Sequence, residues 1–241
     1  MTTVAIIQAR MGSTRLPGKV LMDLAGQPML ARVVSRTLRA TRVDKVVVAT
    51  SKLAADDAIA KLCSDRGWAC FRGDETDVLD RYWRAAQEHR ADLVVRITSD
   101  CPLIDPELVD QVVNLLLSAS ETDYASNIVE PRSFPRGLDC EAFRIDALHR
   151  AWREGQLPVY REHVTTYLWQ HPDKFTVRGL YGDEDHSAER WTVDTPEDLA
   201  LVRAVYEADP QGRWPWREVR RYLTQHPNVR ELNRLVRQRH L

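Results

Sequence analysis

The sequence predicts an α/β protein with a doubly wound, mixed but mostly parallel sheet of the Rossmann-like kind and a C-terminal helical appendage. Short apolar strands alternate with amphipathic helices over the first 120 residues or so. Several of these strands are continuous β-branched runs, as expected where both faces of a sheet are covered. The 241 residues, 44% of them apolar, suffice for one large core. We therefore expect a main domain over residues 1–212 and a helical extension over 213–241 packed on it.

The net charge of −1 argues against binding to nucleic acid or to an anionic membrane through the overall charge of the protein. Residues 213–241 are an exception, with eight Arg against two Glu. Their apolar residues have helical spacing, so we expect two helices that break at His226–Pro227, pack on the main domain and expose a solvated basic face. The residues available for packing are Leu223, Val229, Leu232, Leu235 and Val236. No nucleic-acid role is expected.

Neither a secretory signal pattern nor a run of about 20 apolar residues occurs, so the sequence predicts a cytoplasmic protein without a membrane span. The formation of a homodimer stays open.

A short apolar strand over residues 4–7 runs into a loop from Gln8 to Lys19 that carries three cations, Arg10, Arg15 and Lys19. Gly12 and Gly18 permit tight turns, and consecutive backbone N–H groups in such a turn favour an anion. The loop therefore predicts a polyphosphate site; the alternative is a strand-to-helix turn with solvated arginines. The spacing fits neither a Walker loop nor G-x-G-x-x-G.

The chain then continues as alternating elements. Pro28 opens a helix, and the apolar run 45–49 is a buried strand. Further elements are expected as a helix over 55–66, a strand near 69–71, a helix over 78–89 and a strand over 92–98. Asp100 follows the last of these strands, whereas Asp105 caps the next helix ahead of Pro106. Ligands of open α/β sheets bind at the carboxyl edge, so Asp100 and the first loop are expected to face one crevice.

Residues 123–159 are less regular, and they are expected to form a mixed-sheet region over the pocket. Asp139 and Glu141 are two residues apart, so in a strand both carboxylates would point to one face. Either they point inward and meet cations or ligand hydroxyls, or the face is exposed. A helical stretch is expected over 160–170 and a strand over 174–178.

A strand over 190–194 is expected to end in Asp194, with Thr195 as the cap of a helix that begins at Pro196. Asp194 and Asp100 are thus both strand-end acids without a local structural role. Carboxylates beside a triphosphate suggest Mg²⁺, which proteins hold with one or two carboxylates and the substrate phosphates. Attack at the α-phosphorus then becomes plausible. Without metal, the two carboxylates are expected to repel each other, so neutralising one should be tolerated by the fold.

Seven segments together resemble the spore-coat polysaccharide cytidylyltransferase-like family, which is related to CMP-KDO synthetase and the acylneuraminate cytidylyltransferases. They are IQARMGSTRLPGK (7–19), FRG (71–73), DVLDR (77–81), DCPLID (100–105), RGLD (136–139), REHV (161–164) and VDTPEDL (193–199). The resemblance extends over nearly the whole chain, and its first and last segments are highly specific. At Ser99 the chain departs from the pattern, since relatives usually have Gly there.

The resemblance implies a role for each matching residue. The catalytic residues would be Lys19, Arg15, Asp100 and Asp194, of which Asp100 and Asp194 would hold catalytic Mg²⁺. The nucleotide would be bound by Gln8, Ala9, Arg10, Gly12, Ser13, Arg72, Gly73 and Asp77. The acceptor site would be lined by Arg136, Asp139, Glu141, Arg161 and His163.

The resemblance further implies transfer of CMP from CTP to a sugar acid or a related glycan precursor, with release of pyrophosphate. The acceptor stays open, since a sugar phosphate or a phosphonate is also compatible. Two other functions are considered. A GT-A glycosyltransferase would need a D-x-D motif, which Cys101 and Pro102 interrupt after Asp100. A non-catalytic nucleotide-binding protein would not need the phosphate-binding cations together with both acids.

Overall fold

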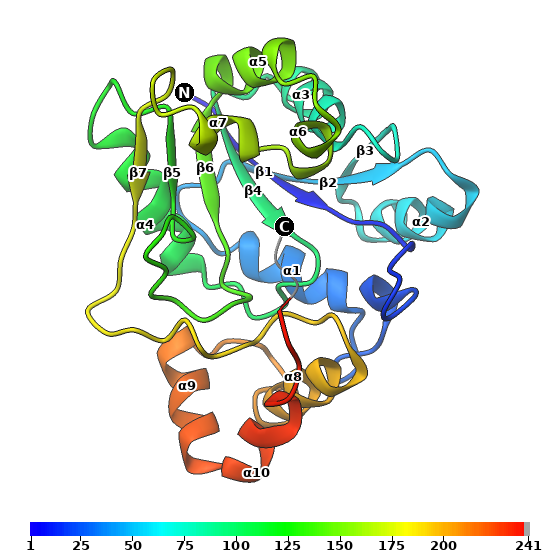
Figure 1. Cartoon of the computed structure of the whole chain (residues 1–241). Coiled ribbons are helices and arrows are strands. Elements are labelled where there is room, and N and C mark those ends of the chain that lie inside the picture. The colour runs from blue at the N-terminus through cyan, green and yellow to red at the C-terminus, as the bar shows by residue number, and fades with distance from the viewer. Residues whose placement is uncertain (239–241) are drawn as a thin grey trace.

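The computed structural model describes residues 1–238 and has a seven-stranded sheet in the order β3-β2-β1-β4-β6-β5-β7 (Figure 1). The strands are β1 (Thr3–Gln8), β2 (Lys45–Ser51), β3 (Ala69–Gly73), β4 (Leu93–Thr98), β5 (Tyr124–Ser126), β6 (Glu141–Arg144) and β7 (Val177–Gly179). β1 pairs in parallel with β2 and β4, and β2 with β3, while β6 is antiparallel to both β4 and β5. The predicted α/β fold with a mixed, mostly parallel sheet is confirmed.

Helices cover both faces of the sheet. The longer ones are α1 (Met29–Thr37), α2 (Asp57–Arg66), α3 (Val78–Glu88), α4 (Pro106–Leu117), α5 (Ile145–Glu154), α8 (Pro196–Ala208) and α9 (Trp216–Gln225). The shorter ones are α6 (Pro158–His163), α7 (Thr166–Gln170), α10 (Pro227–Arg230) and the 3₁₀ turns η1 (Lys19–Leu21), η2 (Ala54–Asp56) and η3 (Glu231–Asn233). One apolar cluster joins one sheet face to α1, α2 and α4, and a second joins the other face to α3, α5 and α7. This double cover explains why the strands are apolar throughout.

A third apolar cluster holds the C-terminal helices against the rest of the chain. It joins α9 and α10 to α8 and to Leu24 and Met29, so α8 packs with the extension, although its residues lie in the predicted main domain (Figure 1). Arg36, only 1% exposed, donates hydrogen bonds to the carbonyl oxygens of Ile104, Gly212 and Trp214. Buried guanidinium groups need such partners, and here they fasten the extension to α1.

The predicted break at His226–Pro227 is confirmed, since α9 ends at Gln225 and α10 begins at Pro227. The expected packing holds only in part. Leu223 and Val229 are buried, whereas Leu232 and Leu235 are exposed. Within residues 1–238, no helix is long and apolar enough to cross a membrane.

The structure corrects three local predictions. The helix expected over 160–170 is interrupted at Val164, which has a φ of 51° and is fully buried, so that core packing overrides helical continuity. Residues 191–194 form no strand within the described chain. The N–H groups of Trp191 and Val193 instead donate to the carbonyl oxygens of Arg136 and Asp100, which lie on loops. The strand expected over residues 174–178 is shorter and begins later in the chain, as β7.

Candidate active site

The first loop leaves β1 at Gln8 and is shaped by backbone contacts. The N–H of Ala9 donates to the carbonyl of Ala49 over 3.0 Å, and the N–H of Met11 donates to Oδ1 of Asp56 over 2.7 Å. Gly18 has a φ of 70°, which few other residues adopt, and its N–H closes the loop onto the carbonyl of Met11. The expected glycine-dependent turn is thus present at Gly18, directly before Lys19 enters η1.

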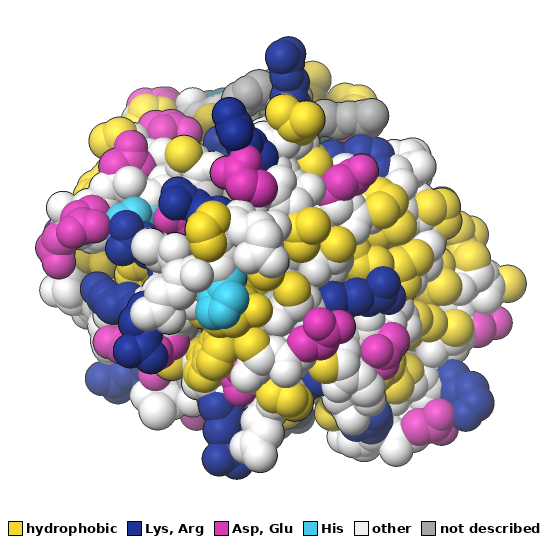
Figure 2. Space-filling view, turned by 90° about the horizontal axis from the view of Figure 1, so that it is seen from below, with side chains coloured by type: hydrophobic (Ala, Val, Ile, Leu, Met, Phe, Trp, Pro, Cys, Tyr) yellow, Lys and Arg dark blue, Asp and Glu magenta, His cyan; other side chains and the backbone are white. Residues whose placement is uncertain are grey.

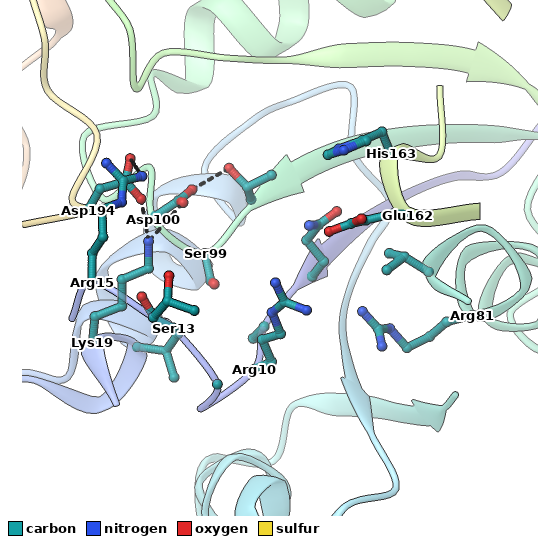
Figure 3. Close-up of a pocket in the computed structure, with 17 residues that line it drawn as sticks. Arg10, Ser13, Arg15, Lys19, Arg81, Ser99, Asp100, Glu162, His163 and Asp194 are labelled. Carbon is teal, nitrogen blue, oxygen red and sulfur yellow. Dashed lines mark hydrogen bonds and ion pairs between the residues drawn. The ribbon is translucent and has the colours of Figure 1, made fainter. Parts of the chain in front are cut away.

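A cavity of about 280 Å³ lies between this loop and the carboxyl ends of β1 and β4 (Figure 3). It brings together ten of the predicted residues, namely Gln8, Ala9, Arg10, Gly12, Ser13, Arg15, Lys19, Asp100, His163 and Asp194. Ser99, the departure from the family pattern, also lines it. Residues without a predicted role line it too, among them Val78, Arg81, Thr98 and Glu162.

Lys19 lies between the two strand-end aspartates. Its Nζ donates to Oδ2 of Asp100 over 3.0 Å, to Oδ1 of Asp194 over 2.9 Å and to the carbonyl of Val193 over 2.7 Å. Burial lowers the pKa of the Lys19 ammonium, but the two carboxylates outweigh burial and raise it above its ordinary value. The ammonium therefore acts as the counter-ion that the two carboxylates share.

Asp194 has two further cationic partners. Its Oδ2 is 3.0 Å from Nη2 of Arg15 and accepts a hydrogen bond from Nη2 of Arg190 over 2.8 Å. Burial raises the pKa of this carboxyl, yet Lys19, Arg190 and Arg15 together lower it below its ordinary value. Arg190 was not predicted as a site residue from the sequence. Its spacing of four residues from Asp194 and eight from Asp198 could have indicated that it pairs with these acids. The expected repulsion between the aspartates is wrong, because three cations compensate it.

Asp100 is more open than Asp194. Its Oδ1 accepts a hydrogen bond from Oγ1 of Thr98 over 2.6 Å, and its side chain is 27% exposed toward the cavity. Arg10 differs from the other loop cations, because it is exposed and makes no hydrogen bond or ion pair with any residue of the described range 1–238. A free guanidinium and an accessible carboxylate thus face the same space (Figure 3).

Three residues predicted to bind the nucleotide lie outside the wall of this cavity. Arg72 pairs with Asp57 over 2.7 Å, and Gly73 ends β3. Asp77 caps α3 by accepting from the N–H of Asp80. The carboxylate of Asp77 is also 2.6 Å from Nη2 of Arg161, one of the predicted acceptor residues. The ion pair between Asp77 and Arg161 joins the start of α3 to α6.

The remaining predicted acceptor residues occupy different surroundings. Asp139 precedes β6, so the strand argument that placed it on one face with Glu141 is wrong; it pairs instead with Arg132. Glu141 is 2% exposed, pairs with Arg96 and accepts a hydrogen bond from the hydroxyl of Tyr124 over 2.8 Å. Of the two alternatives left open for this acid, the inward one that meets a cation is therefore confirmed. Burial and the Glu141 carboxylate raise the pKa of Tyr124 well above its ordinary value.

Gly137 allows the chain to pass against the segment that carries Asp194. Its φ is 102°, and a Cβ at this position would lie 2.4 Å from the backbone nitrogen of Thr192. Both the conformation and the contact require glycine. We expect Gly137→Ala to destabilise the fold by about 2 kcal/mol or more, because strain and a backbone clash add.

Gly26→Ala is the matched control for that substitution. Gly26 has a φ of 82°, but a Cβ there would meet nothing within 4 Å, so only strain is introduced. Urea unfolding of both variants measures the difference. Equal stability losses would show that the close approach of Gly137 to Thr192 does not matter.

Comparisons with known proteins agree with this geometry. A family model described as cytidylyltransferase matches residues 4–226. The chain is 35% identical to the spore coat polysaccharide biosynthesis protein SpsF of Bacillus subtilis, over 84% of this chain and 85% of that protein. It is 32% identical to a 3-deoxy-manno-octulosonate cytidylyltransferase of Anaeromyxobacter dehalogenans, over 84% and 97% of the two chains.

A solved structure described as a cytidylyltransferase from Leptospira borgpetersenii has a TM-score of 0.92 to this chain at 29% identity, and it covers 100% of both chains. The similarity therefore includes the C-terminal helices as well as the sheet. The chain thus belongs to the cytidylyltransferase family, within its spore-coat polysaccharide cytidylyltransferase-like branch, and is a nucleotidyltransferase.

Proposed function

We propose that this chain transfers CMP from CTP to a hydroxyl group of a sugar acid or a related glycan precursor and releases pyrophosphate. The observation that carries the proposal is the convergence of Arg10, Arg15 and Lys19 on the cavity that Asp100 and Asp194 also line. The name of the Anaeromyxobacter relative, a 3-deoxy-manno-octulosonate cytidylyltransferase, supports a sugar acid as acceptor. A reaction that consumes CTP also favours a cytoplasmic location.

The triphosphate is held by the loop cations. Arg10 is already without a counter-ion among the described residues, so its guanidinium is available to phosphate oxygens. Arg15 and Lys19 are paired with Asp194, and they exchange part of this pairing for the phosphates as these enter. The backbone N–H of Gly12, which lines the cavity, provides a further donor for the anion.

Asp100 and Asp194 would hold Mg²⁺. The donor chemistry fits, because the carboxylates of Asp100 and Asp194 both contact one ammonium group, over 3.0 and 2.9 Å, and carboxylate oxygens are the ligands that Mg²⁺ prefers. Within residues 1–238, no group of three or more His, Cys, Asp or Glu forms a metal site by itself, which agrees with an ion that takes its remaining ligands from phosphate and water. When bound, Mg²⁺ supplies Lewis-acid stabilisation of the charge on the transferred phosphoryl group.

The protein's own groups then act on charge and position. The acceptor oxygen forms a bond to the α-phosphorus as the bond from that phosphorus to the bridging oxygen of the β-phosphate breaks, and the hydroxyl proton is released. Arg15 and Lys19 neutralise the charge that develops on the departing pyrophosphate. Arg190 keeps Asp194 oriented during this exchange, because its guanidinium is bound to Asp198 as well.

Arg136 lies outside the wall of the cavity, yet it remains a candidate partner for the acceptor carboxylate. The guanidinium of Arg136 makes no hydrogen bond or ion pair with residues 1–238, and burial together with neighbouring Arg132 lowers its pKa. A carboxylate would relieve this repulsion through a bidentate pair. His163 lines the cavity itself, where burial lowers the pKa of its imidazole, so it is available as a neutral hydrogen-bonding group.

Nucleotide preference is the direct test. CTP with Mg²⁺ is expected to raise the melting temperature more than ATP, GTP or UTP, because a ligand that binds only the folded state stabilises it by mass action. Thermal unfolding with each nucleotide at equal concentration measures the order. Stabilisation by UTP or by a nucleotide sugar, with none by CTP, would contradict the proposal.

Pyrophosphate release with a panel of acceptors extends this test. Release with CTP and a sugar acid supports the proposed reaction. A non-catalytic nucleotide-binding protein would bind CTP without releasing pyrophosphate. A glycosyltransferase would instead consume a nucleotide sugar.

A further inference from the structure

The last described segment, residues 231–238, follows α10 and returns to residues 190–198, the segment that carries Asp194 (Figure 1). We call it the C-terminal strap. Nδ2 of Asn233 donates to the carbonyl of Arg190 and to Oδ1 of Asp198, both over 2.9 Å. Nη1 of Arg190 donates to Oε1 of Gln238. Two side chains of the strap thus contact the residues that hold Asp194.

Asp198 is the centre of these contacts. Its carboxylate is 0% exposed and accepts from Nε and Nη2 of Arg190, each over 2.9 Å, and from the backbone N–H of Asp194 over 3.0 Å. One carboxylate therefore fixes the backbone of Asp194 directly and its side chain through Arg190. A carboxylate has about four acceptor positions, and Asn233 contributes one of the donors that fill them.

Apolar packing does not explain the course of the strap. Leu235 is 91% exposed and Leu232 is 42% exposed. A cavity of about 360 Å³ separates part of the strap from the body, lined by Arg190, Trp191 and Leu201 on one side and by Asn233, Arg234 and Val236 on the other. Figure 2 shows this end of the molecule from below, with charged and apolar side chains intermixed on its surface. The strap is therefore held largely by polar contacts, and these converge on the Asp194 network.

We propose that the C-terminal strap is a positioning element of the active site, in which Asn233 and Gln238 hold Arg190 and Asp198 so that the Asp194 carboxylate keeps its direction. The inference rests on the proposed function for its consequence in catalysis. As the phosphates draw Arg15 and Lys19 away, Arg190 remains the cation on Asp194, and its orientation then decides that of the carboxylate. Coupling between two sites is reciprocal, so nucleotide binding also stabilises the strap.

Hydrogen exchange of the ligand-free protein tests the contact itself. Asn233→Ala removes the donor to Asp198 and is expected to accelerate exchange in a peptide that covers residues 190–199, which contains the N–H groups of Asp194 and Thr195 bound to Asp198. The control is Arg234→Ala, a neighbouring residue whose side chain is 72% exposed and, among residues 1–238, forms an ion pair with Glu231 alone. Equal exchange of residues 190–199 in the two variants overturns the proposal.

Exchange with CTP and Mg²⁺ tests the coupling to the nucleotide in the wild-type protein. We expect protection of the loop over residues 8–19 and, in the same sample, of the strap over residues 231–238. Protection of the loop without the strap overturns the positioning role. If CTP protects neither segment, the nucleotide assignment fails, and the strap proposal is then decided by the ligand-free comparison of the two variants.

Steady-state kinetics of the same variants separates positioning from stability. For Asn233→Ala we expect kcat to fall by about 10-fold, the lower end of the effect of residues that orient a metal ligand, with a smaller change in the KM for CTP. Arg234→Ala should retain the wild-type kcat. A change confined to melting temperature, with kcat unchanged in Asn233→Ala, contradicts the proposal.

Discussion

Asp194→Asn and Asp100→Asn are each expected to lower metal-dependent pyrophosphate release by at least about 10²-fold, the scale of losing one strong transition-state stabiliser. The substitution keeps the size of the side chain and removes its charge. Turnover measured across a Mg²⁺ titration reports the loss. Near-normal turnover of either variant at limiting Mg²⁺ would show that its aspartate is not a metal ligand.

The two variants should differ in stability. Asp194 balances Arg15, Lys19 and Arg190 and is 14% exposed. Its neutralisation leaves Arg15 without its ion pair and takes one of two carboxylate partners from Lys19 and from Arg190, so it lowers the melting temperature. Asp100 is more exposed and, within the described part of the chain, forms an ion pair with Lys19 alone, so Asp100→Asn should unfold closer to the wild-type temperature. Asp65→Asn is the control, since it breaks an exposed pair with Lys61 remote from the cavity and should change neither quantity.

Lys19→Met is expected to impair both stability and catalysis. Its ammonium is 10% exposed and is the group that Asp100 and Asp194 share, so its loss leaves two carboxylates facing each other. We expect a destabilisation of about 2 kcal/mol, below the figure for a fully buried pair because Asp194 retains Arg15 and Arg190. Turnover should fall by about 10²- to 10³-fold, because a charge that stabilises pyrophosphate is gone.

The metal gives this variant a second readout that does not depend on activity. In Lys19→Met, Mg²⁺ alone should raise the melting temperature more than it does in the wild-type protein, since a divalent cation takes the place between the carboxylates that the ammonium has left. Lys61→Met, at a side chain 75% exposed, provides the comparison. A Mg²⁺ effect equal in all three proteins would argue against a shared metal position at Asp100 and Asp194.

Local sequence patterns predicted most of the fold because the strands and caps have strong local causes. The continuous β-branched runs of β2 and β4 required cover on both faces, and the capping roles of Asp105 and Thr195 follow from side chains that satisfy the first N–H groups of α4 and α8. Once these two residues were assigned to caps, Asp100 and Asp194 remained for another role. Both indeed line the cavity.

The errors fall where distant residues decide the outcome. The segment 191–194 forms no strand and is bound to loops instead, which no local pattern reveals. The strand argument for Asp139 failed because β6 begins only at Glu141, where pairing with β4 and β5 starts. The charge balance around Asp194 depends on Arg190, which the family pattern did not single out. The sequence also offers no signal for the contact of Asn233 with Asp198. Pairwise repulsion between two acids was inferred without the lysine that separates them.

The contact between Lys19 and Asp194 joins residues 175 positions apart in the chain, whereas the parallel half of the sheet, β1 to β4, is complete within the first 98 residues. Contacts of such long sequence separation bear a large loop-closure entropy and tend to form after the local βα pairings. The charged cluster is therefore expected to contribute little to the transition state for folding. Interactions absent from that transition state act on the rate of unfolding, so a bound nucleotide would prolong the lifetime of the native protein without making it fold faster.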